Sequence, residues 1–345
     1  MRTYPLRKPP GHVPPVPRWY LQLPAGVTTV HTAYVGVQGQ GPAQGQARAC
    51  VHSWLEDGPD RPDAVERFVV LDGDDAHGAD VWVAYWIDSG AYSRYVARLS
   101  LADWHAALGD GAGTVGLWCE RFSTAVSRLE TNYSGLDYLP GLGQLPRTST
   151  IAHELSAYWG AARDRIPDSA CDRFLAAGDA RSPAASPVGT GEHWRGSNYE
   201  HMIHIRSGQF WERCAPAEAA AYERDLKPVL EEGLRHLWAN ARETGTLGLR
   251  YLCNVDPGGA PRRETCGAGF FRSLGDLEAW AEHHPSHLAI YHGAIAHAKT
   301  WGAGRALRTW HEVSVLKAGE AVFEYLNCAP RTGVLDGVVL ERAAR

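Results

Sequence analysis

The order of predicted elements in the second half of the chain constrains the fold more than any other feature of the sequence. Alternating and amphipathic stretches follow one another as strand, helix, strand, strand, helix, strand. The long helix begins at a proline, which suits a first helical turn, and Pro228 inside it is expected to produce a kink. The predicted elements are a strand at 201–207, a helix at 216–243, strands at 247–255 and 264–272, helices at 274–283 and from 285 to about 300, and a strand at 307–316.

This order is that of the ferredoxin-like split βαβ unit, an antiparallel sheet with helices on one face. The first half of the chain shows a looser version of the pattern. Its predicted elements are strands at 27–37, 80–86 and 114–130 and helices at 43–56 and 91–108. We therefore predict an α+β fold with two such units (βαββαβ) side by side, related by duplication, although no short-period sequence repeat is visible.

Two segments rich in Gly, Pro and Ser, 134–150 and 178–198, are predicted to be linkers between the halves. The length of 345 residues exceeds what one core normally fills, which also favours two units. The predicted organisation is an N-terminal extension at 1–26, a first unit at 27–150, a connecting helix and loop at 151–198, and a second unit at 199–335.

Charge and cysteine content exclude several classes of protein. The formal net charge is −5, and no run of Lys or Arg is long enough to follow nucleic acid or an anionic membrane. We see no signal peptide in residues 1–17 and no apolar stretch that would span a bilayer. Seven scattered cysteines without a CxxC pair favour reduced thiols in a cytoplasmic protein. Cys328 fits either a buried thiol or a thiolate ligand, and the former is commoner.

The usual catalytic signatures are absent from the sequence. There is no GxGxxG after a strand, no Walker loop and no GxSxG elbow. His153-Glu154 and His311-Glu312 lack the second histidine that a zinc protease places four residues on. However, 13 Trp and 14 Tyr outnumber 7 Phe, and indole and phenol groups suit the walls of a wet-edged cavity. The composition therefore suggests a ligand cavity without identifying its ligand.

His287 is a candidate metal ligand because it lies at the start of the predicted helix from 285 to about 300. A helix fixes the direction of the imidazole and leaves one ring nitrogen free for a metal. Ile290 and Ala294 share its helical stripe, so a flat apolar cofactor can lie against that face. A core histidine bonded to a backbone carbonyl fits the same pattern. The remaining histidines of this region are predicted to be solvated: His283, His284, His292 and His297.

His311 and Ser207 are the second pair of candidates. Alternate residues of a strand share a face, so His311 points inward with Val313 and Ser207 points inward with Ile205. With His287 on a facing helix, these side chains can enclose a small polar spot in an apolar cavity. Two buried polar groups with purely structural hydrogen bonds fit the same residues.

Several stretches, in register along the chain, resemble the aldoxime dehydratases. The likeness runs from about Trp118 to the end and includes a Leu129-Glu130-Thr131 match, whereas the first hundred residues match weakly. The motifs that carry it are His284-Pro285-Ser286-His287, Trp310-His311-Glu312-Val313-Ser314-Val315, Tyr325-Leu326-Asn327-Cys328, Ile205-Arg206-Ser207-Gly208-Gln209 and Tyr158-Trp159-Gly160-Ala161-Ala162-Arg163-Asp164-Arg165.

The resemblance implies a lyase that holds haem b in its C-terminal half and, with ferrous iron, converts a small aldoxime, R–CH=N–OH, to R–C≡N and water. It implies that His287 is the proximal iron ligand and His311 the distal catalytic histidine. Ser207 and Arg165 are then pocket hydrogen-bond donors, with Arg163 as the neighbour that could take the place of Arg165, and Glu130 is a pocket-side acid.

Two departures from the family pattern concern packing: Ser286 replaces a threonine, and Ala161-Ala162 replaces a bulkier pair. The related haem folds, of dimeric α/β-barrel type, also include peroxidase-like and chlorite-decomposing enzymes, so such a reaction is the first alternative. A non-enzymatic haem carrier or gas sensor is the second. Because tandem ferredoxin-like sheets commonly pair, we expect a homodimer.

Overall fold

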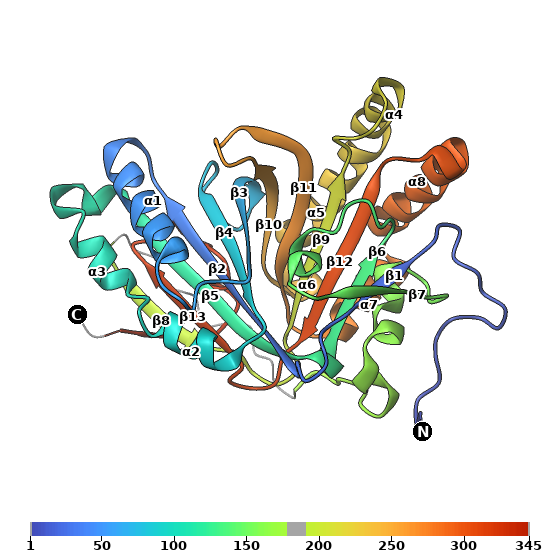
Figure 1. Ribbon diagram of the computed structural model, residues 1–345, viewed down its shortest axis with the longest axis horizontal. Coiled ribbons are helices and arrows are strands. Elements are labelled where there is room, and N and C mark those ends of the chain that lie inside the picture. The colour runs from blue at the N-terminus through green and yellow to red at the C-terminus, as the bar shows by residue number, and fades with distance from the viewer. Residues whose placement is uncertain (1, 178–190, 344–345) are drawn as a thin grey trace.

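A single antiparallel sheet of 14 strands runs through the computed structural model, which describes residues 2–177 and 191–343 (Figure 1). The strand order is β14-β8-β13-β5-β2-β4-β3-β10-β11-β9-β12-β6-β1-β7. The predicted class, helices on an antiparallel sheet, is confirmed. In the described residues, no helix has the length and apolar content that crossing a membrane requires.

Residues 29–125 contain one more strand than the sequence predicted. The missing strand, β3, buries Glu66 beside Phe68 and Val70, and this charged residue on the inward face hides the alternation. The predicted helix at 91–108 is two short helices. The elements are β2 (Thr29–Gln38), α1 (Gly41–Glu56), β3 (Ala64–Gly73), β4 (Asp80–Trp86), α2 (Ser89–Val96), α3 (Leu101–Ala106), the 3-10 helix η1 (Gly109–Thr114) and β5 (Gly116–Ala125).

The second half follows the predicted order closely. A π-helical turn divides the long helix and ends at Leu226, two residues before Pro228. The interruption occurs there because a proline lacks the N–H that would continue α-helical hydrogen bonding. The elements are β9 (Ile203–Phe210), α4 (Pro216–Ala221), the π-helix η6 (Tyr222–Leu226), α5 (Lys227–Ala239), α6 (Ala241–Thr244), β10 (Thr246–Val255), β11 (Pro261–Phe271), α7 (Leu274–His283), α8 (Pro285–Trp301), the 3-10 helix η7 (Gly302–Gly304) and β12 (Arg308–Val315).

Strands beyond the two groups β2–β5 and β9–β12 extend the sheet at both ends. Strand β13 (Ala321–Leu326) pairs with β5 of the first half, and β8 (His193–Ser197) pairs with β13. The part of the predicted linker at 178–190 lies outside the described residues. The helix expected in 151–198 is two 3-10 helices. The remaining elements are β1 (Trp19–Gln22), η2 (Val126–Arg128), β6 (Leu129–Tyr133), η3 (Gly141–Gln144), β7 (Ser149–Ala152), η4 (Trp159–Arg165), η5 (Pro167–Ala170) and β14 (Leu340–Arg342).

The sheet separates three apolar clusters. Helices α1 to α3 cover the first half, and helices α5, α7 and α8 cover the second half (Figure 1). The opposite face carries a cluster from both halves, which includes Phe68, Trp118, Phe270 and Trp310. Burial of this surface is the main favourable contribution to folding.

A glycine and a tryptophan occupy matching places in the two halves. Gly36 on β2 pairs with Trp118 on β5, and Gly208 on β9 pairs with Trp310 on β12. In each pair the indole lies over the glycine, where a methyl group would overlap the ring. Both tryptophans also stack against a buried arginine, Arg250 or Arg206. The last strand of each half carries the same Trp-x-Glu sequence, at 118–120 and at 310–312.

We predict that Gly36→Ala lowers the free energy of unfolding by about 1–3 kcal/mol, because the added methyl group overpacks the ring of Trp118. Denaturant unfolding followed by circular dichroism measures the change. Gly45→Ala is the matched control, since Gly45 lies on α1 with open space around it and alanine there should stabilise the helix by about 0.5–1 kcal/mol. Equal effects of the two substitutions would contradict the packing argument.

Candidate active site

A cavity lies on the helix-covered face of the second half. Its walls come from helices α5 and α8, from strands β9 and β12, from residues 156–159 and from the N-terminal arm at 12–18. Three predicted site residues line it together: His287 from α8, Ser207 from β9 and His311 from β12. The apolar part of the lining includes Leu230, Ile290 and Ala294.

His287 is held by the end of the preceding helix. Pro285 has no N–H, so the Ala281 carbonyl of α7 lacks the donor that the next helical turn would supply. The Nδ1–H of His287 donates to that carbonyl at 2.8 Å instead. A carbonyl only accepts, so this bond fixes the proton on Nδ1 and leaves a lone pair on Nε2. Burial lowers the pKa of His287 to about 4, which keeps the ring neutral at pH 7.

His311 and Ser207 are directly opposite each other on neighbouring strands, and Asn132 of β6 continues the row. The indole Nε1–H of Trp159 donates to His311 Nε2 at 3.0 Å, so the proton of the neutral ring is on Nδ1. That nitrogen is buried without a partner among the described residues. Burial, followed by the positive charge of Arg165, lowers the pKa of His311 well below its usual value.

Arg165 and Glu130 lie behind this row and not in the cavity wall. Arg165 Nε donates to Glu130 Oε1 at 2.5 Å, and Glu130 shares the sheet face of His311 because Asn132, two residues on, pairs with it. Burial raises the pKa of Glu130, while the guanidinium opposes that shift. Arg163 instead pairs with Glu278 of α7 at 3.0 Å. The structure thus places Arg165, and not Arg163, on the His311 side.

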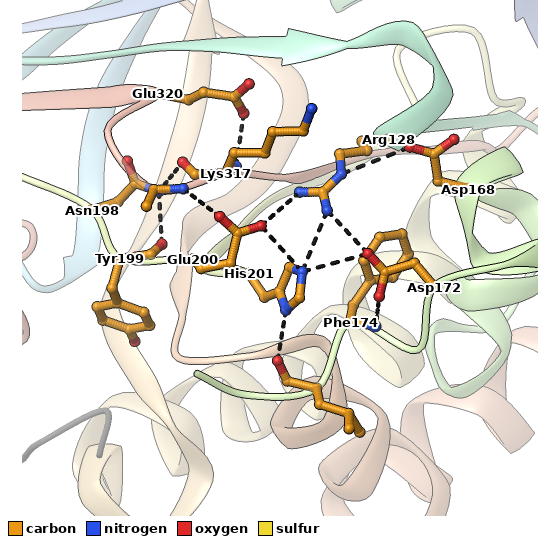
Figure 2. Close-up of polar contacts among 12 residues, drawn as sticks. Arg128, Asp168, Asp172, Phe174, Asn198, Tyr199, Glu200, His201, Lys317 and Glu320 are labelled. Atoms are coloured by element: carbon orange, nitrogen blue, oxygen red, sulfur yellow. Dashed lines mark hydrogen bonds and ion pairs between the residues drawn. The ribbon is translucent and has the colours of Figure 1, made fainter. Parts of the chain in front are cut away.

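The segment that carries Trp159 and Arg165 is fixed at both ends. Its far end is tied to the sheet by Arg128, which pairs with Asp172 at 3.1 Å, Glu200 at 3.3 Å and Asp168 at 3.7 Å (Figure 2). Near Arg165, the Asp164 carboxylate accepts the backbone N–H groups of residues 7 and 8 at 2.8 and 2.9 Å. The N-terminal arm is therefore anchored across this segment before it reaches the cavity.

Two groups of cavity residues could not be identified from the sequence. Trp159 lay within a quoted motif, but its contact with His311 depends on the fold. The N-terminal arm contributes His12, Val16 and Arg18 to the lining, and its proline-rich sequence has no pattern that marks it as a cavity wall.

The other metal-ligand candidates are placed elsewhere or differently from the prediction. Cys328 is not among the cavity-lining residues; its thiol donates to the Leu117 carbonyl at 3.2 Å, and burial raises its pKa. His297, predicted to be solvated, is buried and accepts from Arg305 at 3.2 Å. His284 is half-buried and caps α8. His283 and His292 are exposed.

The equivalent place in the first half is apolar. When the Gly–Trp pairs are matched, His311 corresponds to Cys119 and Ser207 to Val35, which are themselves directly opposite on β5 and β2. Both belong to the apolar cluster beneath α1 and α3. Burial raises the pKa of Cys119 to about 12, so its thiol is not a ready ligand. Polar cavity chemistry is therefore concentrated in the second half.

Known proteins similar to this chain share its full length. The model of haem-containing dehydratases matches residues 33–334. An aliphatic aldoxime dehydratase of Pseudomonas chlororaphis is 32% identical over 98% of this chain and 96% of its own, and a phenylacetaldoxime dehydratase of Bacillus sp. (strain OxB-1) is 28% identical over 95% and 93%.

Solved structures agree with these relatives. A crystal structure of aldoxime dehydratase, 32% identical, has a TM-score of 0.81 and covers 98% of this chain and 96% of that one. An aldoxime dehydratase in complex with butyraldoxime, 28% identical, has a TM-score of 0.82 with coverage of 98% and 94%. The chain therefore belongs to the family of haem-containing dehydratases, among the aldoxime dehydratases.

Proposed function

We propose that this protein dehydrates aldoximes, R–CH=N–OH, to nitriles and water at a haem b held by His287. The observation that carries the proposal is the hydrogen bond of His287, which occupies Nδ1 and leaves Nε2 unprotonated. His287 lines the same cavity as Ser207 and His311. Relatives across the full length act, by their names, on aliphatic aldoximes and phenylacetaldoxime.

The residues of the cavity fit a haem. An iron ligand must be a neutral imidazole with a free nitrogen, and its other nitrogen is normally bound to a carbonyl or carboxylate; His287 meets each condition. The walls from α5 and α8 offer apolar surface to a porphyrin. On the sheet side, His311 Nδ1 is a buried polar atom that has no hydrogen-bond partner within residues 2–177 and 191–343. Such a group is expected where a ligand completes the hydrogen bonding.

The chemical task of the protein is to move protons at the oxime. A ferrous haem held by His287 would supply electron density to the N–O bond of the oxime. His311 gives a proton to the departing hydroxyl, so that water leaves, and then takes the proton from the C–H group as the nitrile forms. Ser207, directly opposite on β9, donates to the oxime oxygen and holds it beside His311. The charge of Arg165 favours the bond-breaking charge distribution.

Nitrile formation is the test of this function. Dithionite-reduced holoprotein mixed anaerobically with butyraldoxime should produce butyronitrile, detected by gas chromatography. Peroxide-dependent dye oxidation or chlorite decomposition without nitrile would favour the alternative haem reaction. Tight CO binding without any turnover would favour a carrier or sensor.

We also propose that residues 27–150 and 199–335 each contain a ferredoxin-like unit. In both halves the four strands lie in the order fourth, first, third, second, as β5-β2-β4-β3 and β12-β9-β11-β10. The matching Gly–Trp pairs support duplication. Strands β3 and β10 join the two units, and β13 crosses back to the first unit.

We also propose a cytoplasmic homodimer. Five thiols that are buried in the fold support a reducing compartment: Cys119, Cys214, Cys253, Cys266 and Cys328. The terminal strands β14 and β7 each pair on one side among the described residues, which leaves sheet edges that a second subunit can cover.

We predict that His287→Ala abolishes the Soret band of the purified protein, because no other cavity-lining histidine projects from α8. Absorption spectra of protein expressed with ample porphyrin precursor measure the loss. His292→Ala is the matched control, since His292 is exposed on the same helix, and it should retain full haem content. Undiminished haem in His287→Ala would mean that another residue holds the iron.

We predict that His311→Ala retains haem but loses about 10²–10⁴-fold in kcat, the usual contribution of a positioned acid–base group. The haem:protein ratio and the rate of nitrile formation are measured on the same sample. Retained turnover would remove His311 from the mechanism.

We predict that Arg165→Gln moves the alkaline pH limb of kcat/KM upward, because His311 must be protonated to act as the acid. The positive charge of Arg165 lowers the pKa of His311, so its removal raises that pKa and the ring becomes protonated at higher pH. Loss of the ion pair to Glu130 acts in the same direction. Arg165→Lys keeps the charge and should shift the profile less. An unchanged or downward-shifted limb for Arg165→Gln would show that Arg165 does not act on His311 electrostatically.

A further inference from the structure

Arg18 is a cavity residue of the N-terminal arm, and its positive charge has no carboxylate partner among the described residues. It lies directly before β1 and lines the cavity together with His12 and Val16. The polar contact of its guanidinium within the described residues is Nη1 to Thr309 Oγ1, at 3.5 Å. Its Nε is enclosed and has no hydrogen-bond partner there.

Four other arginines with buried side chains are each paired with a carboxylate, whereas buried Arg305 donates to His297 at 3.2 Å and has no ion pair among the described residues. Arg128, Arg165, Arg206 and Arg250 have a carboxylate oxygen at 3.1, 2.5, 2.6 and 2.7 Å, respectively. No described carboxylate lies within ion-pair distance of Arg18. An enclosed charge without a partner is costly, so an anion is expected in the part of the cavity that Arg18 and Arg305 line.

Burial and neighbouring positive charges make the unpaired charge of Arg18 more costly. Burial, together with the neighbouring positive charges of Arg305 and Arg165, lowers its pKa to about 9, so the group stays charged at pH 7. Arg305 lines the same cavity. A monoanion suffices for one guanidinium, and the planar fork of arginine fits both oxygens of a carboxylate.

We propose that Arg18 binds a carboxylate that enters the cavity as part of a ligand. This inference rests on the proposed haem-dependent function, which offers two sources of that group: a propionate of the haem, or a carboxylate carried by the aldoxime. Thr309 and His311 are two residues apart on β12, so the carboxylate lies about 7 Å along the strand from the reacting group. An aldoxime that reaches both positions therefore needs a short alkyl spacer.

The first arm of the test measures haem release. Transfer of haem to excess apomyoglobin is timed for the wild type, Arg18→Gln, Arg18→Lys and the control Arg235→Gln, whose side chain is exposed on α5. If a propionate is bound, Arg18→Gln accelerates release about tenfold or more. Haem dimethyl ester should then be released at equal rates from all four proteins, and Arg18→Lys should lie between the wild type and Arg18→Gln.

The second arm measures substrate binding. Ferrous holoprotein is titrated, by its absorption spectrum, with an ω-carboxyalkyl aldoxime and with the methyl ester of the same compound. If the carboxylate belongs to the substrate, the wild type prefers the acid by about tenfold or more and Arg18→Gln loses that preference. Circular dichroism verifies that each variant is folded.

An Arg18→Gln variant that changes neither haem release nor the acid-over-ester preference overturns the proposal, and an effect in either arm supports it and identifies the source. Failure of the proposed function gives a different pattern. A wild type that makes nitrile from butyraldoxime while Arg18→Gln has no effect retains the function and loses only this inference. If Arg18→Gln selectively changes haem release in a protein that makes no nitrile, the inference about Arg18 stands and the proposed function fails.

Discussion

The hydrogen bond from His287 to the Ala281 carbonyl is the constraint on which the site depends. It exists because Pro285 interrupts the chain of helical N–H donors at the junction of α7 and α8. A local break in backbone hydrogen bonding therefore sets the tautomer of an imidazole two residues later. The bond also fixes the ring direction, and burial keeps the ring neutral, so that Nε2 is available to iron. Without this bond, the ring of His287 would have no fixed direction in the cavity that Ser207 and His311 also line.

The two halves show how one architecture is specialised. Both keep a glycine beneath a tryptophan at matching positions, because each indole needs a surface without a side chain. One step along the strands, the first half has Val35 and Cys119 while the second has Ser207 and His311. The first pair packs against the helices, and the second pair faces a cavity. The two halves thus share the Gly–Trp packing, while the neighbouring pair of residues is apolar in the first half and polar in the second.

Much of this could be predicted from the sequence where the signals are local. Alternation placed Ser207 and His311 on one sheet face, and helix spacing placed His287 on the side of the cavity. Strand β3 could not be found, because Glu66 occupies an inward position and is matched by Arg206 from the other half of the chain. Neither the contact of Trp159 with His311 nor the cavity wall formed by the arm around Arg18 could be predicted, since both join residues distant in sequence through tertiary packing.

The coordination of the iron tests the account most directly. A crystal structure of the reduced holoprotein with butyraldoxime should show His287 Nε2 bonded to the iron. The oxime should then lie beside Ser207 and His311. Iron bound by a different side chain, or an oxime on the same side as α8, would contradict the account.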